Sequence, residues 1–231
     1  MWWYGPGATW DGRIDSVDTE RGTMDFTVLR DGATVGAFTS LLVGEHNLYN
    51  QVAATAAAVR QGIDAEALAR GFASFQGIKR RQEILGEPGR VTVVDDFAHH
   101  PTAVRVTLDA LRQRFGGRRL WAVWEPRSAT SRRATFQEAY AEAFDAADQV
   151  IVAAPYDQSR IPEEERFSST RLVQDLTVRG VDAQTLADAN QIAGALAAAT
   201  QPHDVVAILS NGGFGGLHRK LLDLLAARFG S

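Results

Sequence analysis

The sequence predicts an α/β protein whose main part is a Rossmann-like, mostly parallel sheet with helices on both faces. Beyond Gly77, short apolar strands alternate with helices, which is the pattern of repeated β-α-β units. Polar side chains follow several of these strands, and ligands in such folds bind at the carboxyl ends of the strands. Before Gly77 the pattern differs, because extended segments come first and two helices follow them.

The extended segments of the first part predict an antiparallel β meander, with strands over 13–17, 24–29 and 34–42. The turn dipeptide Asp31-Gly32 separates the last two strands. An alanine-rich run over 47–59 has high helix propensity and predicts the first helix. A second helix over 65–75 follows Asp64, whose side chain suits a helix N-cap.

The second part contains the repeated alternation of strands and helices. Strands are predicted over 91–94, 120–123, 149–153, 183–186 and 205–209. Helices are predicted over 102–115, 135–146, 169–178, 190–199 and 217–229. The Gly77-Ile78-Lys79 segment is the expected hinge, so the chain is divided into two domains, 1–78 and 79–231.

Composition narrows the class of protein. A net charge of -4 and a pI near 5.7 do not favour non-specific binding of nucleic acid. The chain has no cysteine, so neither disulfides nor a thiolate metal site is available, as is usual in a reducing compartment. No apolar stretch reaches the roughly 18 residues that a membrane span needs, and the first residues lack the basic region of a signal peptide. We expect a soluble, cytoplasmic protein without nucleic-acid or membrane partners.

Asn47 and Asn50 lie where the predicted strands give way to the first helix, in the segment GEHNLYN. They are three residues apart, so both can project from one side of the first helical turn. A carboxamide donates and accepts side by side, which matches an edge of adenine. The alternative is that Asn caps the helix.

Two charged segments flank the first strand of the second part. Arg80 and Arg81 in Lys79-Arg80-Arg81 carry forked donors suited to phosphate oxygens, and the alternative is a solvated basic surface. Asp96 lies at the carboxyl end of the strand predicted over 91–94, where a carboxylate can accept ribose hydroxyls or hold Mg²⁺. His99 and His100 follow it, but without a third ligand they do not predict a metal site. The alternative is that Thr102 caps a helix and the histidines are packed.

Two later loops also follow strands. The loop EPRSATSRR carries Arg127, Ser128 and Arg132, which suit a carboxylate or a phosphate, and the alternative is a basic loop that caps the next helix. Ser210 and Asn211 open a glycine-rich turn whose backbone N–H groups can approach an anion. The turn does not fit G-x-G-x-x-G and is not a Walker A loop, so the sequence does not favour a dinucleotide site.

Five segments, in this order, resemble the second half of the Mur ligases: GEHNLYNQVAATAAA, GIKRRQEILGE, VDDFAHHPTAV, EPRSATSRR and SNGGFGGLHRKLL. The resemblance extends from Gly44 to Phe229. It implies an ATP- and Mg²⁺-dependent ligase that forms an amide bond in bacterial wall synthesis. The chain looks most similar to the murein peptide ligase branch, which joins L-alanyl-γ-D-glutamyl-meso-diaminopimelate to UDP-N-acetylmuramate in peptidoglycan recycling.

The resemblance also implies roles for single residues. ATP contacts are expected from Asn47, Asn50, Arg80, Arg81 and Asp96. Contacts to the other substrates are expected from His99, His100, Arg127, Ser128, Arg132, Ser210 and Asn211. No catalytic residue and no metal ligand is assigned within this chain, because Mg²⁺ is expected to bind mainly to the part of the family that carries the P-loop.

The chain departs from the family in one respect, because no G-x-x-x-x-G-K-[ST] P-loop occurs in its sequence. Residues 1–78 are therefore expected to be the end of the central ATP-binding domain, followed by the C-terminal domain over 79–231, and the chain alone is expected to be inactive. Two alternatives stay open. One is a fragment of UDP-N-acetylmuramate:L-alanine ligase, whose loop typically reads Gln-Pro-His-Arg-Tyr where this chain has Glu-Pro-Arg-Ser. The other is a non-catalytic, nucleotide-responsive module.

Overall fold

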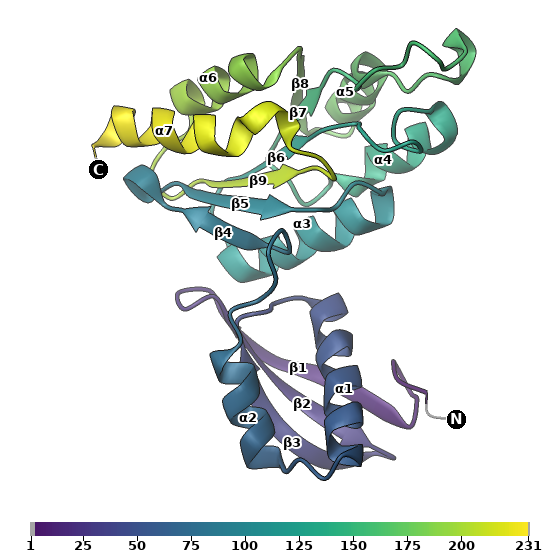
Figure 1. The fold of residues 1–231 in the computed structure, drawn as a ribbon, viewed down its shortest axis with the longest axis vertical. Helices are drawn as coiled ribbons and strands as arrows, with labels where there is room; N and C mark the ends of the chain where they lie inside the picture. Colours follow the sequence, from purple (N-terminus) through teal and green to yellow (C-terminus); the bar gives the residue numbers. More distant parts are fainter. Residues whose placement is uncertain (1–2, 231) are drawn as a thin grey trace. The chain divides into compact units, whose positions relative to one another are not determined.

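The computed structural model describes residues 3–230, and its chain path is shown in Figure 1. The chain forms two compact units. The first holds the residues up to Gly77 together with Asp109–Gly116, and the second holds Ile78–Leu108 and the residues from Gly117 onward. None of the helices described is long and apolar enough to cross a membrane.

The first unit is an antiparallel sheet with the strand order β1-β2-β3, packed against two helices (Figure 1). Its elements are β1 (Trp10–Asp18), β2 (Thr23–Arg30), β3 (Ala33–Ser40), α1 (Glu45–Arg60) and α2 (Ala65–Ser74). Met24, Phe26 and Val28 alternate along β2 and are fully buried, because successive side chains of a strand point to opposite faces. They form one core with Leu48 and Val52 of α1. The predicted meander and both helices are present.

The second unit is a six-stranded sheet in the order β4-β5-β9-β6-β7-β8. Its strands are β4 (Glu83–Gly86), β5 (Thr92–Asp96), β6 (Leu120–Trp124), β7 (Gln149–Ala153), β8 (Asp182–Leu186) and β9 (Val205–Leu209). Its helices are α3 (Pro101–Phe115), whose residues from Asp109 onward group with the first unit, α4 (Gln137–Ala143), α5 (Ser169–Val178), α6 (Ala189–Ala199) and α7 (Leu217–Phe229). Single 3-10 turns span Pro88–Arg90, Ala134–Phe136, Glu163–Glu165 and Phe214–Gly216. Five strands run parallel and β4 is antiparallel, which confirms the predicted mostly parallel sheet.

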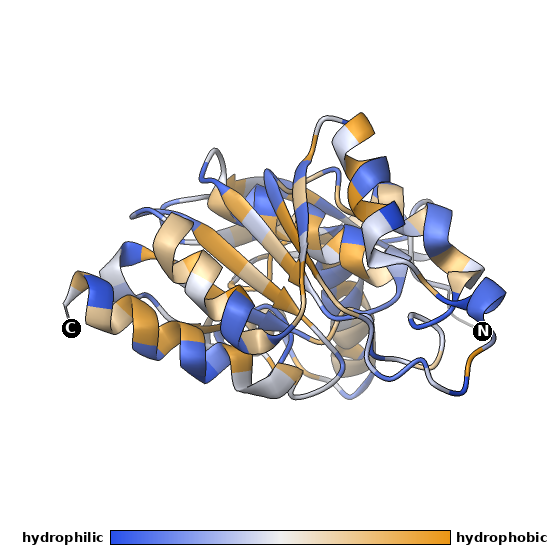
Figure 2. Ribbon diagram, turned by 90° about the horizontal axis from the view of Figure 1, so that it is seen from above, coloured by the Kyte–Doolittle hydropathy of each residue, from blue (hydrophilic) through white to orange (hydrophobic). Residues whose placement is uncertain are grey.

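Helices cover both faces of this sheet (Figure 1). On β6, Trp121 and Val123 belong to the core formed with α6 and α7. Trp124 points to the other face, where its ring lies 4.2 Å from that of Tyr140 on α4. The strands are mostly orange in Figure 2, whereas the helices carry both apolar and polar residues. This agrees with a parallel sheet that is buried on both sides.

The second unit differs from the prediction in two elements, a strand that was not predicted and a helix that is shorter. β4 was not predicted, because it is only four residues long, ends in Gly86 and lies at the edge of the sheet with an irregular register. The helix predicted over 135–146 is shorter, since Thr135 lies in a 3-10 turn and α4 ends at Ala143.

Candidate functional site

The carboxyl ends of β5, β9 and β6 form the candidate site. β9 lies between β5 and β6, and α7, which follows β9, packs on the opposite face from α4, which follows β6. Ligands of α/β sheets bind outside the strand ends at such a reversal, and we refer to this edge of the sheet, from Arg80 to Gly212, as the crevice. Asp95 and Asp96 end β5, Ser210 follows β9, and Glu125 follows β6.

Ser210 and Glu125 link two of these strand ends. The Ser210 hydroxyl donates to Glu125 Oε2 over 2.5 Å, and both side chains are buried. The Ser210 N–H donates to the Asp96 carbonyl, and the Gly212 N–H donates to the Ser210 hydroxyl over 2.9 Å. A buried carboxylate that accepts a hydrogen bond from a hydroxyl group has a restricted orientation. Glu125 is therefore held in place by the turn that follows β9.

Arg127 lies beside Ser210 and Glu125 and keeps part of its side chain accessible. Its guanidinium lies 3.5 Å from Glu125 Oε1 and 4.0 Å from the centre of the Tyr156 ring. A third of the Arg127 side chain, 33%, is exposed. Within residues 3–230, this guanidinium makes no hydrogen bond, so apart from its ion pair with Glu125 its N–H donors are available to an anion.

Arg80 has a different environment. Its guanidinium donates to the carbonyls of Ser210 and Gly212 over 2.6 and 2.8 Å, and its Nε lies 3.3 Å from Asp95 Oδ2. It also lies 5.1 Å from the centre of the Phe97 ring. Arg81 next to it is exposed and contacts the same ring at 5.4 Å. Of the two arginines expected at phosphate, Arg80 is thus engaged within the protein and Arg81 faces solvent.

Asp96 is buried and its two oxygens already have donors. Oδ2 accepts from the Gln82 N–H and Oδ1 from the Ala98 N–H, both over 2.8 Å, and the Thr107 hydroxyl lies 3.4 Å from Oδ1. Burial raises the pKa of Asp96 above its usual value. The two backbone hydrogen bonds lower this pKa, but their effect is smaller than that of burial. The carboxylate thus orders the segments before and after β5, and this use leaves few of its lone pairs for a ribose.

The two histidines have separate surroundings. His99 Nδ1 lies 2.9 Å from the Phe97 carbonyl, and the His99 carbonyl accepts from the Tyr140 hydroxyl over 2.6 Å. His100 is exposed and its ring lies 4.7 Å from that of Phe136. α3 begins at Pro101, so a helix cap by Thr102 is not what fixes this segment.

The remaining predicted residues of the second unit order their own loops. The Ser128 hydroxyl donates to that of Ser131, and Arg132 donates to the carbonyls of Ser128 and Asp157. These bonds join the loop after β6 to the loop after β7. Asn211 is half-buried, and its Oδ1 is buried without a hydrogen-bond partner within the described part of the chain.

Asn47 and Asn50 lie on α1, in the first unit. The helix begins at Glu45 with Gly44 as its N-cap, so Asn47 is not the cap residue. Its side-chain amide donates to the Val43 carbonyl over 2.9 Å. Asn50 is exposed.

Besides Asp95 and Glu125, two residues of the crevice were given no role from the sequence, Tyr156 and Gly212. Tyr156 follows β7, and its N–H donates to the Pro126 carbonyl, which brings the ring beneath Arg127. A Cβ on Gly212 would lie 2.2 Å from Arg127 Cδ, so the glycine makes room for that side chain. The signal for both was their position directly after a strand, although pairing with Arg127 requires the strand order.

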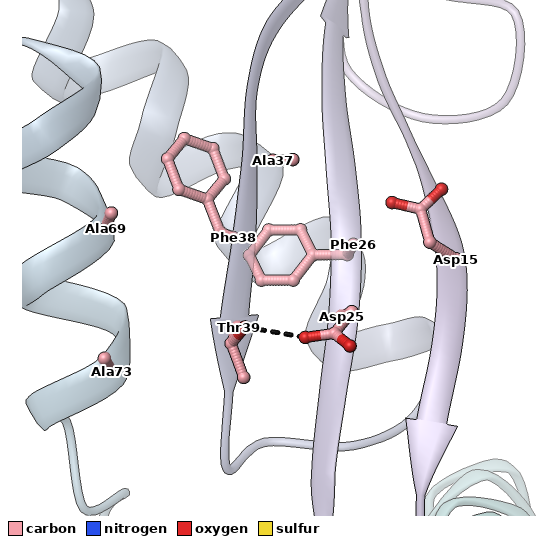
Figure 3. A pocket seen from close by; sticks show the side chains of 8 residues that line it. All are labelled: Asp15, Asp25, Phe26, Ala37, Phe38, Thr39, Ala69 and Ala73. Atoms are coloured by element: carbon pink, nitrogen blue, oxygen red, sulfur yellow. Dashed lines mark hydrogen bonds between the residues drawn. The ribbon is translucent and has the colours of Figure 1, made fainter.

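A separate cavity of about 340 Å³ lies in the first unit, and Figure 3 shows its lining. It is lined by Asp15, Asp25, Phe26, Ala37, Phe38, Thr39, Ala69 and Ala73. Its carboxylates are engaged, since Thr39 donates to Asp25 and Thr27 to Asp15, each over 2.6 Å. None of the residues predicted at a site lines this cavity. Among residues 3–230, no group of three or more His, Cys, Asp or Glu is arranged to hold a metal ion.

Comparison with known families decides the relationship. Residues 80–212, more than half of the chain, match the family model described as "Mur ligase, glutamate ligase domain". The chain belongs to the Mur ligase family. This confirms the resemblance drawn from the five ordered sequence segments, and the matched range contains the whole crevice from Arg80 to Gly212.

Individual Mur ligases show the same relationship. The UDP-N-acetylmuramate--L-alanyl-γ-D-glutamyl-meso-2,6-diaminoheptandioate ligase of Escherichia coli is 42% identical over 88% of this chain and 43% of its own length. A UDP-N-acetylmuramate--L-alanine ligase of a Roseiflexus species is 32% identical over 97% of this chain and 47% of its own length. The solved murein peptide ligase of Psychrobacter arcticus has 30% identity and a TM-score of 0.61, covering 95% of this chain and 44% of its own. The chain thus spans slightly less than half the length of these relatives.

Proposed function

We propose that the chain is part of an ATP-dependent ligase that joins L-alanyl-γ-D-glutamyl-meso-diaminopimelate to UDP-N-acetylmuramate in peptidoglycan recycling. The crevice at the ends of β5, β9 and β6 receives the incoming peptide. The observation that supports this proposal is Arg127, whose guanidinium lies beside Glu125 and Tyr156 and makes no hydrogen bond within residues 3–230.

The chemistry of Arg127 suits a carboxylate of the peptide. A guanidinium presents parallel N–H groups that pair with both oxygens of a carboxylate, and such charge-assisted bonds are among the stronger polar contacts. The peptide is rich in carboxylates, whereas its reacting end is an amine. Arg127 therefore binds a part of the peptide remote from the reaction and orients the amine towards the muramoyl carboxyl group.

Nucleotide contacts are proposed for the exposed residues of the ATP set, Asn50 and Arg81. Asn47 and Asp96 use part of their polar groups within the protein, so they order the segments around these contacts. The residues described show no cluster that fits Mg²⁺, and we assign the ion to the P-loop domain of the whole ligase. When bound, Mg²⁺ supplies charge neutralisation for the phosphates.

The domain assignment follows from the same relationship. We propose that residues 1–78 are the end of the central ATP-binding domain and that residues 79–231 are the C-terminal domain of the ligase. The protein would act in the cytoplasm, where the UDP-linked precursor is made. The partners are UDP-N-acetylmuramate, the peptide and the domains that carry the P-loop, with no role for nucleic acid or a membrane.

L-Alanine is the second candidate for the amine substrate, because an L-alanine ligase matches 97% of the chain at 32% identity. The tripeptide ligase of Escherichia coli is more similar, at 42% identity. The Glu-Pro-Arg-Ser loop also differs from the Gln-Pro-His-Arg-Tyr typical of L-alanine ligases. Both observations favour the peptide.

Isothermal titration calorimetry of the 231-residue chain tests this choice. We expect heat of binding with L-alanyl-γ-D-glutamyl-meso-diaminopimelate and none with L-alanine at equal concentration. An Arg219→Ala variant, altered at a side chain that is 90% exposed on α7, is the matched control and should bind as the parent chain does. Binding of L-alanine alone would replace the peptide by the amino acid, and binding of neither would contradict the proposal.

A further inference from the structure

We propose that Arg80 is a positioning residue for Arg127 and not a ligand of phosphate. It holds the turn over Ser210–Gly212 in the shape that seats the Arg127 guanidinium in the crevice. This inference rests on the proposed function, because it assigns to Arg80 an effect on the peptide and not on ATP.

The first step is the hold of Arg80 on the turn. One nitrogen of its guanidinium donates to the carbonyls of both Ser210 and Gly212, and its Nε lies 3.3 Å from Asp95 Oδ2. Asp95 is fixed in turn by His218 of α7, whose Nε2 lies 3.0 Å from Oδ1. A single side chain thus bridges the end of β5 and two carbonyls of the turn after β9.

The backbone of Arg80 is fixed as well. Its N–H donates to Glu83 Oε2 over 2.7 Å, and its carbonyl accepts from the Phe97 N–H over 3.0 Å. Its φ of 60° lies in the left-handed region, which an arginine rarely adopts without support from its surroundings. The residue is held at both its main chain and its side chain, which suits a structural bridge.

The second step leads from the turn to Arg127. The turn presents the Ser210 hydroxyl to Glu125, and Glu125 Oε1 lies 3.5 Å from the Arg127 guanidinium. Gly212 lies so close to Arg127 that an added Cβ would be 2.2 Å from its Cδ. Movement of the turn therefore shifts both the carboxylate that pairs with Arg127 and the backbone on which its stem rests.

The use of its donors separates Arg80 from a phosphate ligand. Three of its five N–H groups are directed at the carbonyls and at Asp95, and a phosphate would have to displace them. Asp95 beside it is an acceptor whose negative charge disfavours a second anion. Arg127 also has a carboxylate beside it, since Glu125 Oε1 lies 3.5 Å away, but within residues 3–230 its guanidinium makes no hydrogen bond that an anion would have to displace.

A double-mutant cycle in the full 231-residue chain tests the inference. The variants are Arg80→Ala, Arg127→Ala and both together, with Arg219→Ala as control, and the probe is L-alanyl-γ-D-glutamyl-meso-diaminopimelate in calorimetry. If Arg80 acts through Arg127, Arg80→Ala weakens binding about tenfold, and the double variant is no weaker than Arg127→Ala to within about twofold. Additive losses in the double variant would show an independent contact and would overturn the inference.

Hydrogen exchange of the Gly212 amide gives a readout without any ligand. This N–H donates to the Ser210 hydroxyl, so Arg80→Ala should speed its exchange while Arg219→Ala leaves it unchanged. Unchanged exchange in Arg80→Ala would contradict the inference even if no peptide binds. Failure of the parent chain to bind peptide, with faster exchange in Arg80→Ala, would instead contradict the proposed function and keep the structural role of Arg80.

Two further variants guard against simple loss of the fold. Arg80→Lys keeps the positive charge but has no second nitrogen that could reach Asp95 while the first donates to the two carbonyls, so it should weaken peptide binding by an intermediate factor. Gly212→Ala leaves Arg80 in place and displaces Arg127, and it should match Arg127→Ala in affinity. Wild-type peptide affinity in both variants, or a loss of ATP affinity alone in Arg80→Ala, would overturn the inference.

Discussion

At the residue scale, Arg80 and Arg81 show how two identical neighbours acquire different environments. The sequence gives both the same chemistry, and both were expected at the ATP phosphates. The two carbonyls that accept hydrogen bonds from Arg80 lie 130 and 132 residues further along the chain. Only the folded sheet brings them within reach, so the difference from Arg81 could not be predicted from the sequence.

Arg127 is the residue for which we propose a contact to the peptide. We expect Arg127→Ala to raise the KM for the peptide roughly ten- to a hundredfold in the whole ligase, because a charge-assisted pair contributes about 1.5 to 3 kcal/mol. The KM for ATP should change little. Arg81→Ala should give the opposite pattern if it contacts phosphate.

Steady-state kinetics with each substrate varied in turn measures both constants. Arg127→Lys serves as the conservative variant, since it retains the charge without the planar fork, and it should recover part of the affinity. A rise in the KM for ATP on Arg127→Ala, with the KM for the peptide unchanged, would mean that the loop after β6 serves the nucleotide.

At the element scale, the strands and helices of the second unit were largely predictable, because each buried strand is an apolar run bounded by loop residues. β4 was not, since four half-exposed residues at an edge carry little pattern. It matters to the site, however. Gln82, directly before β4, donates its N–H to Asp96, and Arg80 lies two residues earlier.

Whether the second unit is an independently folding domain can be tested. We expect a chain of residues 79–231 to fold alone, because its sheet is complete and its core on the α6 and α7 face is made by its own residues. A chain of residues 88–231 lacks β4 and the Gln82 donor to buried Asp96, so it should melt at a lower temperature.

Circular dichroism during heating compares the two truncated chains. The longer one should show an α/β spectrum and a cooperative transition. An unfolded spectrum for 79–231 would place the domain boundary elsewhere, and equal melting temperatures for both chains would mean that β4 contributes nothing to the sheet.

At the scale of the whole molecule, the alternation of strands and helices predicts a parallel sheet but not the order of its strands. β9 is the last strand in the sequence, yet it pairs with both β5 and β6. This insertion places Ser210 against Glu125 and Gly212 against Arg127. The sequence therefore indicated the loops that follow these strands, whereas the contacts between their side chains depend on the strand order and could not be predicted.

Amide ligation by the completed enzyme tests the central claim most directly. The chain is fused to the part of the Escherichia coli relative that it does not cover, and the product is measured by mass spectrometry with ATP, UDP-N-acetylmuramate and either amine substrate. We predict that the fused protein forms UDP-N-acetylmuramoyl-tripeptide only with ATP, prefers the tripeptide to L-alanine, and that the 231-residue chain alone forms none. Ligation by the chain alone, a preference for L-alanine, or no ligation by the fused protein would contradict the account.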